Sequence, residues 1–163
     1  MLASPVAAGE PRLKEARLLA LLIPAALLGG ALFSQYVGGL YPCEMCYWQR
    51  WPHGAAILLA LVAMLSPLHS PRTRPLILLA ALAIAISGAI GVFHAGVELG
   101  WWEGMTRCTT NGATSLEDIL KVPLVRCDQV QWTFLGISLA GWNAIVSLGG
   151  AAVVTFLATR KSA

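Results

Sequence analysis

The stretch PCEMCYWQRW at residues 42–51 decides how the rest of the chain is arranged. Cys43 and Cys46 are separated by two residues, aromatic residues and Arg50 follow, and a long apolar run begins near Trp51. A cysteine pair with this spacing is found in redox-active disulfides, in halves of metal sites and in static structural disulfides. The sequence on either side must distinguish among these three possibilities.

The composition is that of an integral membrane protein. Of the 163 residues, 57% are hydrophobic and only 12% are charged, whereas a soluble domain carries about 25% charged residues. The length indicates a single domain. A net charge of +3 does not indicate nucleic-acid binding here, because the basic residues form no stripe with interleaved aromatic residues. They lie at the ends of apolar runs, where orientation signals belong.

Four apolar runs predict four membrane spans, at about residues 18–37, 51–65, 76–97 and 133–158. The first run resembles the apolar core of a cleaved signal peptide, but it is long for such a segment and no clean small-x-small site ends it. About 20 helical residues cross the hydrocarbon core, which this run provides. We therefore predict an all-α bundle of four transmembrane helices in one domain over 1–163, preceded by a disordered tail at 1–12.

The distribution of lysine and arginine predicts the orientation. Seven of the eleven lie in the N-terminal tail, in the 68–75 loop and at the C-terminal end, whereas six of the eight acidic residues lie in the other two loops. The positive-inside rule then places both termini in the cytoplasm and the two other loops on the outer side. Five tryptophans are expected in an aromatic belt at the outer interface: Trp48, Trp51, Trp101, Trp102 and Trp132.

This topology places all four cysteines on the outer side, with Cys43 and Cys46 in the first loop and Cys108 and Cys127 in the second. Disulfides persist outside the cytosol, which favours a redox role. Four thiolates could instead bind zinc, but the second pair is spread over nineteen positions and an oxidising compartment disfavours four free thiolates. A static structural disulfide remains the other alternative.

Residues close to the first pair suggest an electron acceptor at the membrane surface. Arg50 follows Cys46 by four residues, so a helix would place both on one face; alternatively, Arg50 only extends to the lipid phosphates. Gln49 could add a hydrogen bond to a bound group. His94, at the outer end of the third run, is either an ordinary interfacial histidine or a hydrogen-bond donor or proton route to that group.

The second outer loop contains one further predicted element. Ser115 and Asp118 form an N-cap pattern, and Leu116, Ile119 and Leu120 share a helical face. We expect a short amphipathic helix over 115–122, which either lies on the membrane surface or packs on the bundle as an ordinary loop helix.

Taken together, these features resemble the bacterial disulfide bond formation protein B family. The segments that carry the resemblance are 42–52, 94–98 and 127–136, and it extends over roughly residues 18–158. It implies a quinone-dependent thiol oxidase of the bacterial inner membrane, using ubiquinone or menaquinone. The implied partner is a periplasmic thioredoxin-fold oxidant (DsbA-like) that inserts disulfides into secreted proteins.

The resemblance also implies a role for each site residue. Cys108 would form the mixed disulfide with the partner, and Cys127 would pass electrons to Cys43. Cys46 would face the quinone ring, with Arg50 beside it and His94 in the same pocket. These roles make the first cysteine pair the junction between protein thiols and a lipid-dissolved acceptor.

Two other functions compete with this one. A quinone reductase similar to vitamin K epoxide reductases is also helical with a C-x-x-C motif, but that motif usually lies late in the chain, near the last span. A non-enzymatic membrane protein could use two disulfides to staple its outer loops.

Overall fold

The computed structural model describes residues 5–105 and 125–160, with side chains from Arg12 onward. The helices and strands are α1 (Pro5–Tyr36), α2 (Glu44–Leu65), α3 (Thr73–Glu98), β1 (Thr133–Phe134), β2 (Ile137–Ser138) and α5 (Leu139–Thr159).

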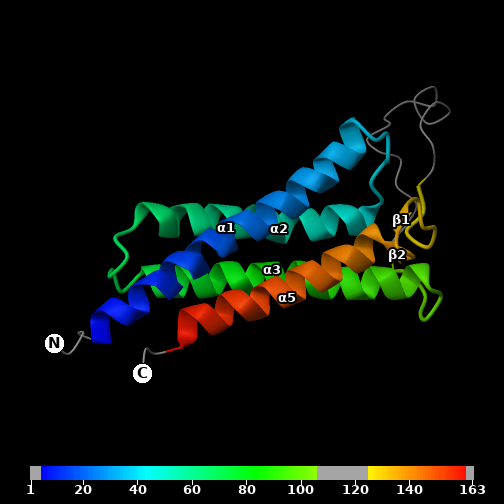
Figure 1. The fold of residues 1–163 in the computed structure, drawn as a ribbon. Coiled ribbons are helices and arrows are strands. Elements are labelled where there is room, and N and C mark those ends of the chain that lie inside the picture. The colour runs from blue at the N-terminus through cyan, green and yellow to red at the C-terminus, as the bar shows by residue number, and fades with distance from the viewer. Residues whose placement is uncertain (1–4, 106–124, 161–163) are drawn as a thin grey trace.

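The four long helices form a bundle with all of its described connections at two ends (Figure 1). Helix α3 packs against α2 and α5, and α1 lies obliquely across α2 and α5. Both ends of the chain and the connection between α2 and α3 lie at one end of the bundle. The loop before α2, the segment after α3 and the β1–β2 hairpin lie at the opposite end, which we call the cysteine end.

Three of the helices in the described residues are long and apolar enough to cross a membrane: the Arg12–Tyr36 part of α1, α3 and α5. Helix α2 has 22 residues but carries Gln49, Arg50 and His53 in its first half. A helical bundle with three helices able to cross a membrane is therefore confirmed, while α2 as a fourth span stays a prediction.

The half of the bundle that contains the termini is packed mainly through alanine. Its fully buried residues include Ala20, Ala60 and Ala80, with Ile77 and Ile84 filling the larger spaces. Small side chains allow helix backbones to approach closely, as is common in membrane bundles. This half holds the helices together and positions the cysteine end.

Three helix starts differ from the sequence prediction, and one of them is that of α2, which begins at Glu44, ahead of the predicted residue 51. The tail that we expected to be disordered is helical from Pro5 onward, and proline suits a first helical position because its φ angle is already fixed. At the other end, α5 begins at Leu139 rather than near residue 133. The helix predicted over 115–122 lies outside the described residues.

The late start of α5 has a local cause. Thr133 pairs with Ser138 and Phe134 with Ile137, which leaves Leu135 and Gly136 as a two-residue turn. Both turn residues have positive φ, 52° and 77°, as a hairpin turn of type I′ requires. Ser138 then caps α5 by accepting a hydrogen bond from the amide of Gly141.

Candidate active site

The cysteine pair forms the start of α2. Cys43 is the N-cap residue, and its Sγ accepts a hydrogen bond from the backbone amide of Cys46 at 3.3 Å. The two sulfur atoms are 2.9 Å apart. The N-terminus of a helix carries a partial positive charge that favours an anion. The pair is therefore placed where a thiolate is stabilised and where a disulfide can form with little movement.

Cys127 joins this pair from the second loop. Its side chain hydrogen-bonds with that of Cys43, and both residues are buried in an apolar cluster with Met45, Val97 and Val125. Three of the four cysteines predicted to be catalytic thus lie together, and Cys108 lies outside the described residues. The sulfur of Cys127, from the second loop, contacts the sulfur of Cys43, from the first, as exchange between the two pairs requires.

The two cysteines of the first pair differ in acidity. The pKa of Cys43 is raised by hydrogen bonds with the Cys127 and Cys46 side chains and by burial. The pKa of Cys46, which precedes the predicted span 51–65, is lowered mainly by its hydrogen bond with the Cys43 side chain, with the Arg50 charge contributing. Cys46 therefore ionises first, and the thiolate is the nucleophilic form of a cysteine.

His94 lies directly behind Cys43. Its Nε2 is 3.5 Å from the Cys43 sulfur, and its Nδ1 is 2.8 Å from Nε2 of Gln49. The sequence suggested that Gln49 could add a hydrogen bond to a bound group, but both the nitrogen and the oxygen of its side-chain amide are engaged within the bundle. Its nitrogen also contacts the backbone oxygen of Met45, and its oxygen accepts from Asn143. The structure thus directs Gln49 toward His94.

A buried polar network continues from Gln49 into the bundle, which the sequence reasoning missed. The Asn143 amide donates to Gln49 and to Ser87, and its oxygen accepts from Ser147 and lies 2.9 Å from Nε2 of His53. Ser87 also donates to the backbone oxygen of Gln49 at 2.8 Å. Buried polar groups within membrane spans are rare and commonly functional. That property was readable in the sequence as polar residues inside apolar runs.

Arg50 is held within the protein, between α1 and an aromatic ring. Its guanidinium donates to the Gln35 side chain and to the backbone oxygen of Ala31 at 3.2 Å, and it lies 5.2 Å from the centre of the Tyr47 ring. Its buried Nε has no hydrogen-bond partner among the described residues. An acceptor oxygen beside Cys46 would satisfy this donor, so the site fits a small carbonyl compound. Neither Gln35 nor Tyr47 was predicted from the sequence.

Comparison with known proteins decides the family. The family model described as "Disulfide bond formation protein DsbB" matches residues 13–157. The chain belongs to this family. Proteins named "Disulfide bond formation protein B" from Methylococcus capsulatus and Hahella chejuensis are 34% and 30% identical, over 85% and 88% of this chain and 90% and 92% of their own. One from Aromatoleum aromaticum is 33% identical over 74% of this chain and 77% of its own. No solved structure matches.

Membership in the disulfide bond formation protein B family confirms the resemblance expected from the sequence. It favours disulfide chemistry over the zinc alternative, although Cys43, Cys46 and His94 each offer a ligand atom within 4.8 Å of the others. A metal would bind the lone pair of Nε2 on His94, so the ring proton would have to be on Nδ1. That N–H would then face the amide nitrogen of Gln49, which is also a donor. The hydrogen bonding of this imidazole therefore suits a sulfur partner better than a metal ion.

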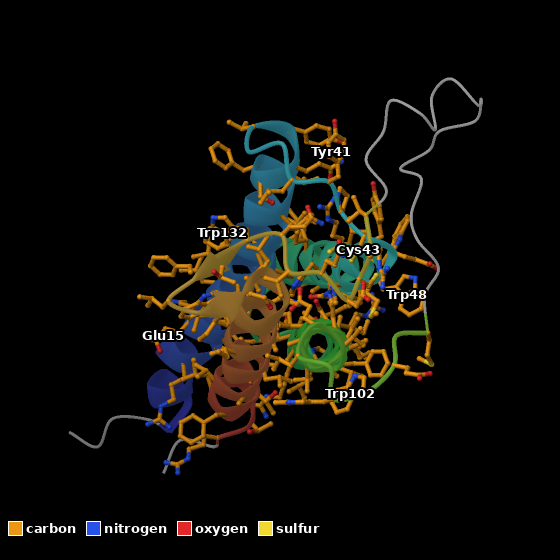
Figure 2. All side chains as sticks on the ribbon, turned by 90° about the vertical axis from the view of Figure 1, so that its right-hand side faces the viewer. Glu15, Tyr41, Cys43, Trp48, Trp102 and Trp132 are labelled. Atoms are coloured by element: carbon orange, nitrogen blue, oxygen red, sulfur yellow. The ribbon has the colours of Figure 1, made fainter. Side chains whose placement is uncertain are left out.

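In this member of the family, exposed aromatic side chains gather at the cysteine end. Figure 2 looks onto the cysteine end and shows Cys43 between Tyr41, Trp48, Trp102 and Trp132. Each of these aromatic residues is more than a third exposed. Aromatic side chains are enriched at membrane–water interfaces, so their position fits a cysteine pair near the membrane surface.

Proposed function

We propose that this protein oxidises a periplasmic thioredoxin-fold dithiol protein and passes the electrons through its two cysteine pairs to a quinone in the bacterial inner membrane. The observation that carries the proposal is the meeting of Cys43, Cys46 and Cys127, from two separate loops, around one buried point. A static pair of loop disulfides does not need a sulfur from one loop beside the N-terminus of a helix that carries the other pair.

The proposed transfer is a series of thiol–disulfide exchanges. A partner thiolate attacks Cys108 of a Cys108–Cys127 disulfide, so that the partner–Cys108 bond forms, the Cys108–Cys127 bond breaks and the electron pair leaves on Cys127. The partner's second thiolate then attacks the partner's own sulfur in this mixed disulfide, which forms the partner's disulfide and releases Cys108 as a thiolate. The Cys127 thiolate attacks Cys43, so that a Cys43–Cys127 bond forms and the Cys43–Cys46 bond breaks. Cys46 takes the electron pair as the thiolate, the form that its environment favours.

Arg50 and Cys46 are the residues proposed to hold and reduce the quinone. A bound quinone supplies a two-electron, two-proton acceptor that dissolves in the bilayer. The Arg50 guanidinium places charge next to the oxygen that gains electron density, and such preorganised donors are a major source of rate enhancement. The Nε of Arg50 has no hydrogen-bond partner in the part of the chain that the structure describes, which supports this role.

We further propose that α2 is the fourth span, that both termini are cytoplasmic and that the cysteine loops are periplasmic. The clustering of Lys and Arg toward the end of the bundle that holds the termini supports this orientation. Fusion of a periplasm-dependent reporter to residue 104, and of a cytoplasm-dependent reporter to residue 163, tests it. Activity of each reporter in the opposite compartment would reverse the assignment.

The decisive experiment follows quinone absorbance with purified protein in lipid nanodiscs and a reduced thioredoxin-fold partner. The wild type is expected to consume quinone, and C46S is expected to lose this activity. R50Q is expected to raise the apparent KM for quinone by about tenfold or more, because a charge-assisted hydrogen bond is lost. The matched control is R72Q, which changes an exposed arginine at the other end of the bundle. Normal turnover by C46S would refute the proposal.

A further inference from the structure

The polar network behind the cysteines has a fixed direction, because two backbone carbonyls orient its two amide side chains. Nε2 of Gln49 is 3.2 Å from the Met45 oxygen, and Nδ2 of Asn143 is 3.2 Å from the Ser87 oxygen. A carbonyl oxygen can only accept a hydrogen bond, so the atom that faces it must be the amide nitrogen. Neither amide can be turned over without losing this bond.

The orientation of Asn143 determines the role of each atom of Gln49. The Asn143 nitrogen donates to Oε1 of Gln49 at 2.7 Å, and the Gln49 nitrogen donates to Nδ1 of His94 at 2.8 Å. A neutral imidazole has one donor and one acceptor nitrogen. Because Nδ1 of His94 accepts, the proton of this ring is on Nε2.

The groups in front of Nε2 agree with this tautomer. Nε2 lies 3.5 Å from the sulfur of Cys43 and 3.8 Å from Oε1 of Glu98, and His94 also hydrogen-bonds with the backbone of Cys127; each of these groups is an acceptor. The other carboxylate oxygen of Glu98 accepts from the Ser138 hydroxyl, which holds that side chain in place. His94 is 3% exposed, so bulk water does not compete for its proton.

We infer that Gln49, oriented by Asn143, is a positioning residue that holds His94 with its proton on Nε2 and thereby aims an N–H donor at the sulfur of Cys43. Amide side chains pass on a hydrogen-bond direction but do not readily relay protons, so the network is an orienting device. The chemical consequence rests on the proposed function, whereas the tautomer itself does not.

The donor acts where Cys43 is the leaving group. An incoming thiolate attacks the Cys127 sulfur of a Cys43–Cys127 disulfide; its bond to Cys127 forms, the Cys43–Cys127 bond breaks, and the electron pair leaves on Cys43. Cys43 is 2% exposed, so solvent cannot stabilise this thiolate. A leaving thiolate that accepts a hydrogen bond is a better leaving group.

The test combines a spectroscopic and a kinetic measurement on the full chain in nanodiscs. Long-range proton–nitrogen correlation spectra of ¹⁵N-histidine-labelled protein distinguish the two imidazole tautomers, and the H94N variant identifies the signals of His94. The wild type at rest is expected to show the Nε2–H form. Q49E replaces a donor by an acceptor and is expected to move the proton to Nδ1.

The kinetic arm measures how fast a reduced thioredoxin-fold partner converts the Cys43–Cys46 disulfide to thiols in quinone-free protein, by quenched alkylation. Q49E is expected to slow this step about tenfold, the effect of one hydrogen bond. The control S147A removes a donor at the far side of Asn143 and is expected to change neither readout. Q49M, of similar length, replaces Q49E if Q49E does not fold, and is expected to give a mixture of tautomers.

An Nδ1–H tautomer in the wild type, or an unchanged tautomer in Q49E and Q49M, would overturn the inference. The tautomer of His94 is measured without partner or quinone. If the wild type shows the Nε2–H form but consumes no quinone, the inference about the tautomer holds and only the proposed function fails. If the His94 proton shifts to Nδ1 in Q49E but the rate of thiol–disulfide exchange is unchanged, His94 does not assist Cys43 as a leaving group.

Discussion

The two halves of the bundle are built from the same helices but are held together differently. Near the termini, α2, α3 and α5 meet through alanine side chains and a few larger apolar residues such as Ile84. Toward the cysteine end, these helices instead bury Gln49, Ser87 and His94, which form a hydrogen-bonded network with the partly buried Asn143. Apolar packing tolerates small rotations of a helix about its axis, whereas a chain of hydrogen bonds allows only one rotational position.

This difference indicates how the molecule divides its tasks. Buried polar groups cost free energy unless they are satisfied, and hydrogen bonds between membrane helices contribute only about 0.6–2 kcal/mol each. The polar half therefore adds little net stability but fixes the positions of the side chains around the sulfurs. We expect substitutions in the alanine half to lower stability, and those in the polar half mainly to alter thiol chemistry.

The largest effect on stability is expected for I84A. Ile84 is fully buried in the alanine half, and removing such a side chain costs about 2–5 kcal/mol because a cavity remains. Unfolding in mixed detergent micelles would measure this loss, while the rate of alkylation of Cys46 should not change. The control L82A alters a half-exposed leucine on the same helix; a loss as large in L82A would contradict the proposed division.

The substitution R17M tests whether the alanine half depends on packing alone. Nη1 of Arg17 donates to the backbone oxygens of Ala63 and Ser66 at 3.1 Å each, where α2 ends. These oxygens lack partners within the helix, and hydrogen bonds to charged groups contribute about 1.5–3 kcal/mol. A loss in that range is expected from the same unfolding measurement, with the exposed Arg12 in R12M as the control. A wild-type value for R17M would leave packing as the sole determinant.

The substitution G91A acts on the contact between α3 and α5 beside the polar network. A methyl group there would lie 3.0 Å from the Ala140 oxygen and the Ala144 nitrogen, and 3.1 Å from the Asn143 amide. Because two of these neighbours are backbone atoms, the helices must separate, at a cost of about 1–3 kcal/mol. Exchange between the cysteine pairs should also slow. G149A, which meets no atom within 4 Å, should change neither quantity.

The smallest effect is expected for D128N, next to Cys127. The pKa of Asp128 is lowered by hydrogen bonds from Arg126, including one from Nε at 2.9 Å. A depressed carboxyl pKa stabilises the fold above the usual carboxyl range and loses that contribution as the pH falls through the lowered value. Both side chains are exposed, so stability at pH 7 should not change measurably. A clear loss in D128N at neutral pH would show that this loop is more tightly held than its exposure suggests.

The sequence predicted what depends on composition and order along the chain. Long apolar runs predicted the helices, and the spacing of Cys43, Cys46 and Arg50, with a second pair in a later loop, led to the family. These features are local or additive, so they can be recognised without coordinates. The position of Cys127 beside the first pair joins two distant segments; the resemblance to the family implied it, and the structure shows Cys127 and Cys43 in one cluster.

The network and the hairpin could not be predicted in this way. Whether Asn143 faces Gln49 depends on the rotation of α5 and on its close approach to Gly91, which no single run of sequence encodes. The sequence suggested that Gln49 could add a hydrogen bond to a bound group, but it gave no indication that its amide contacts Met45, His94 and Asn143. The hairpin turn is formed by Leu135 and Gly136, and leucine gives no signal for a positive φ angle.

Because a sulfur atom caps α2, one backbone amide reports the redox state of the cysteines. The Cys46 amide donates to the same Sγ of Cys43 that would bond to Cys46 or Cys127 during turnover. Formation of a disulfide to Cys127 changes the charge on this sulfur, so the hydrogen bond from the amide is expected to weaken. Its proton chemical shift and hydrogen-exchange rate should therefore follow the state of the sulfurs without any added probe.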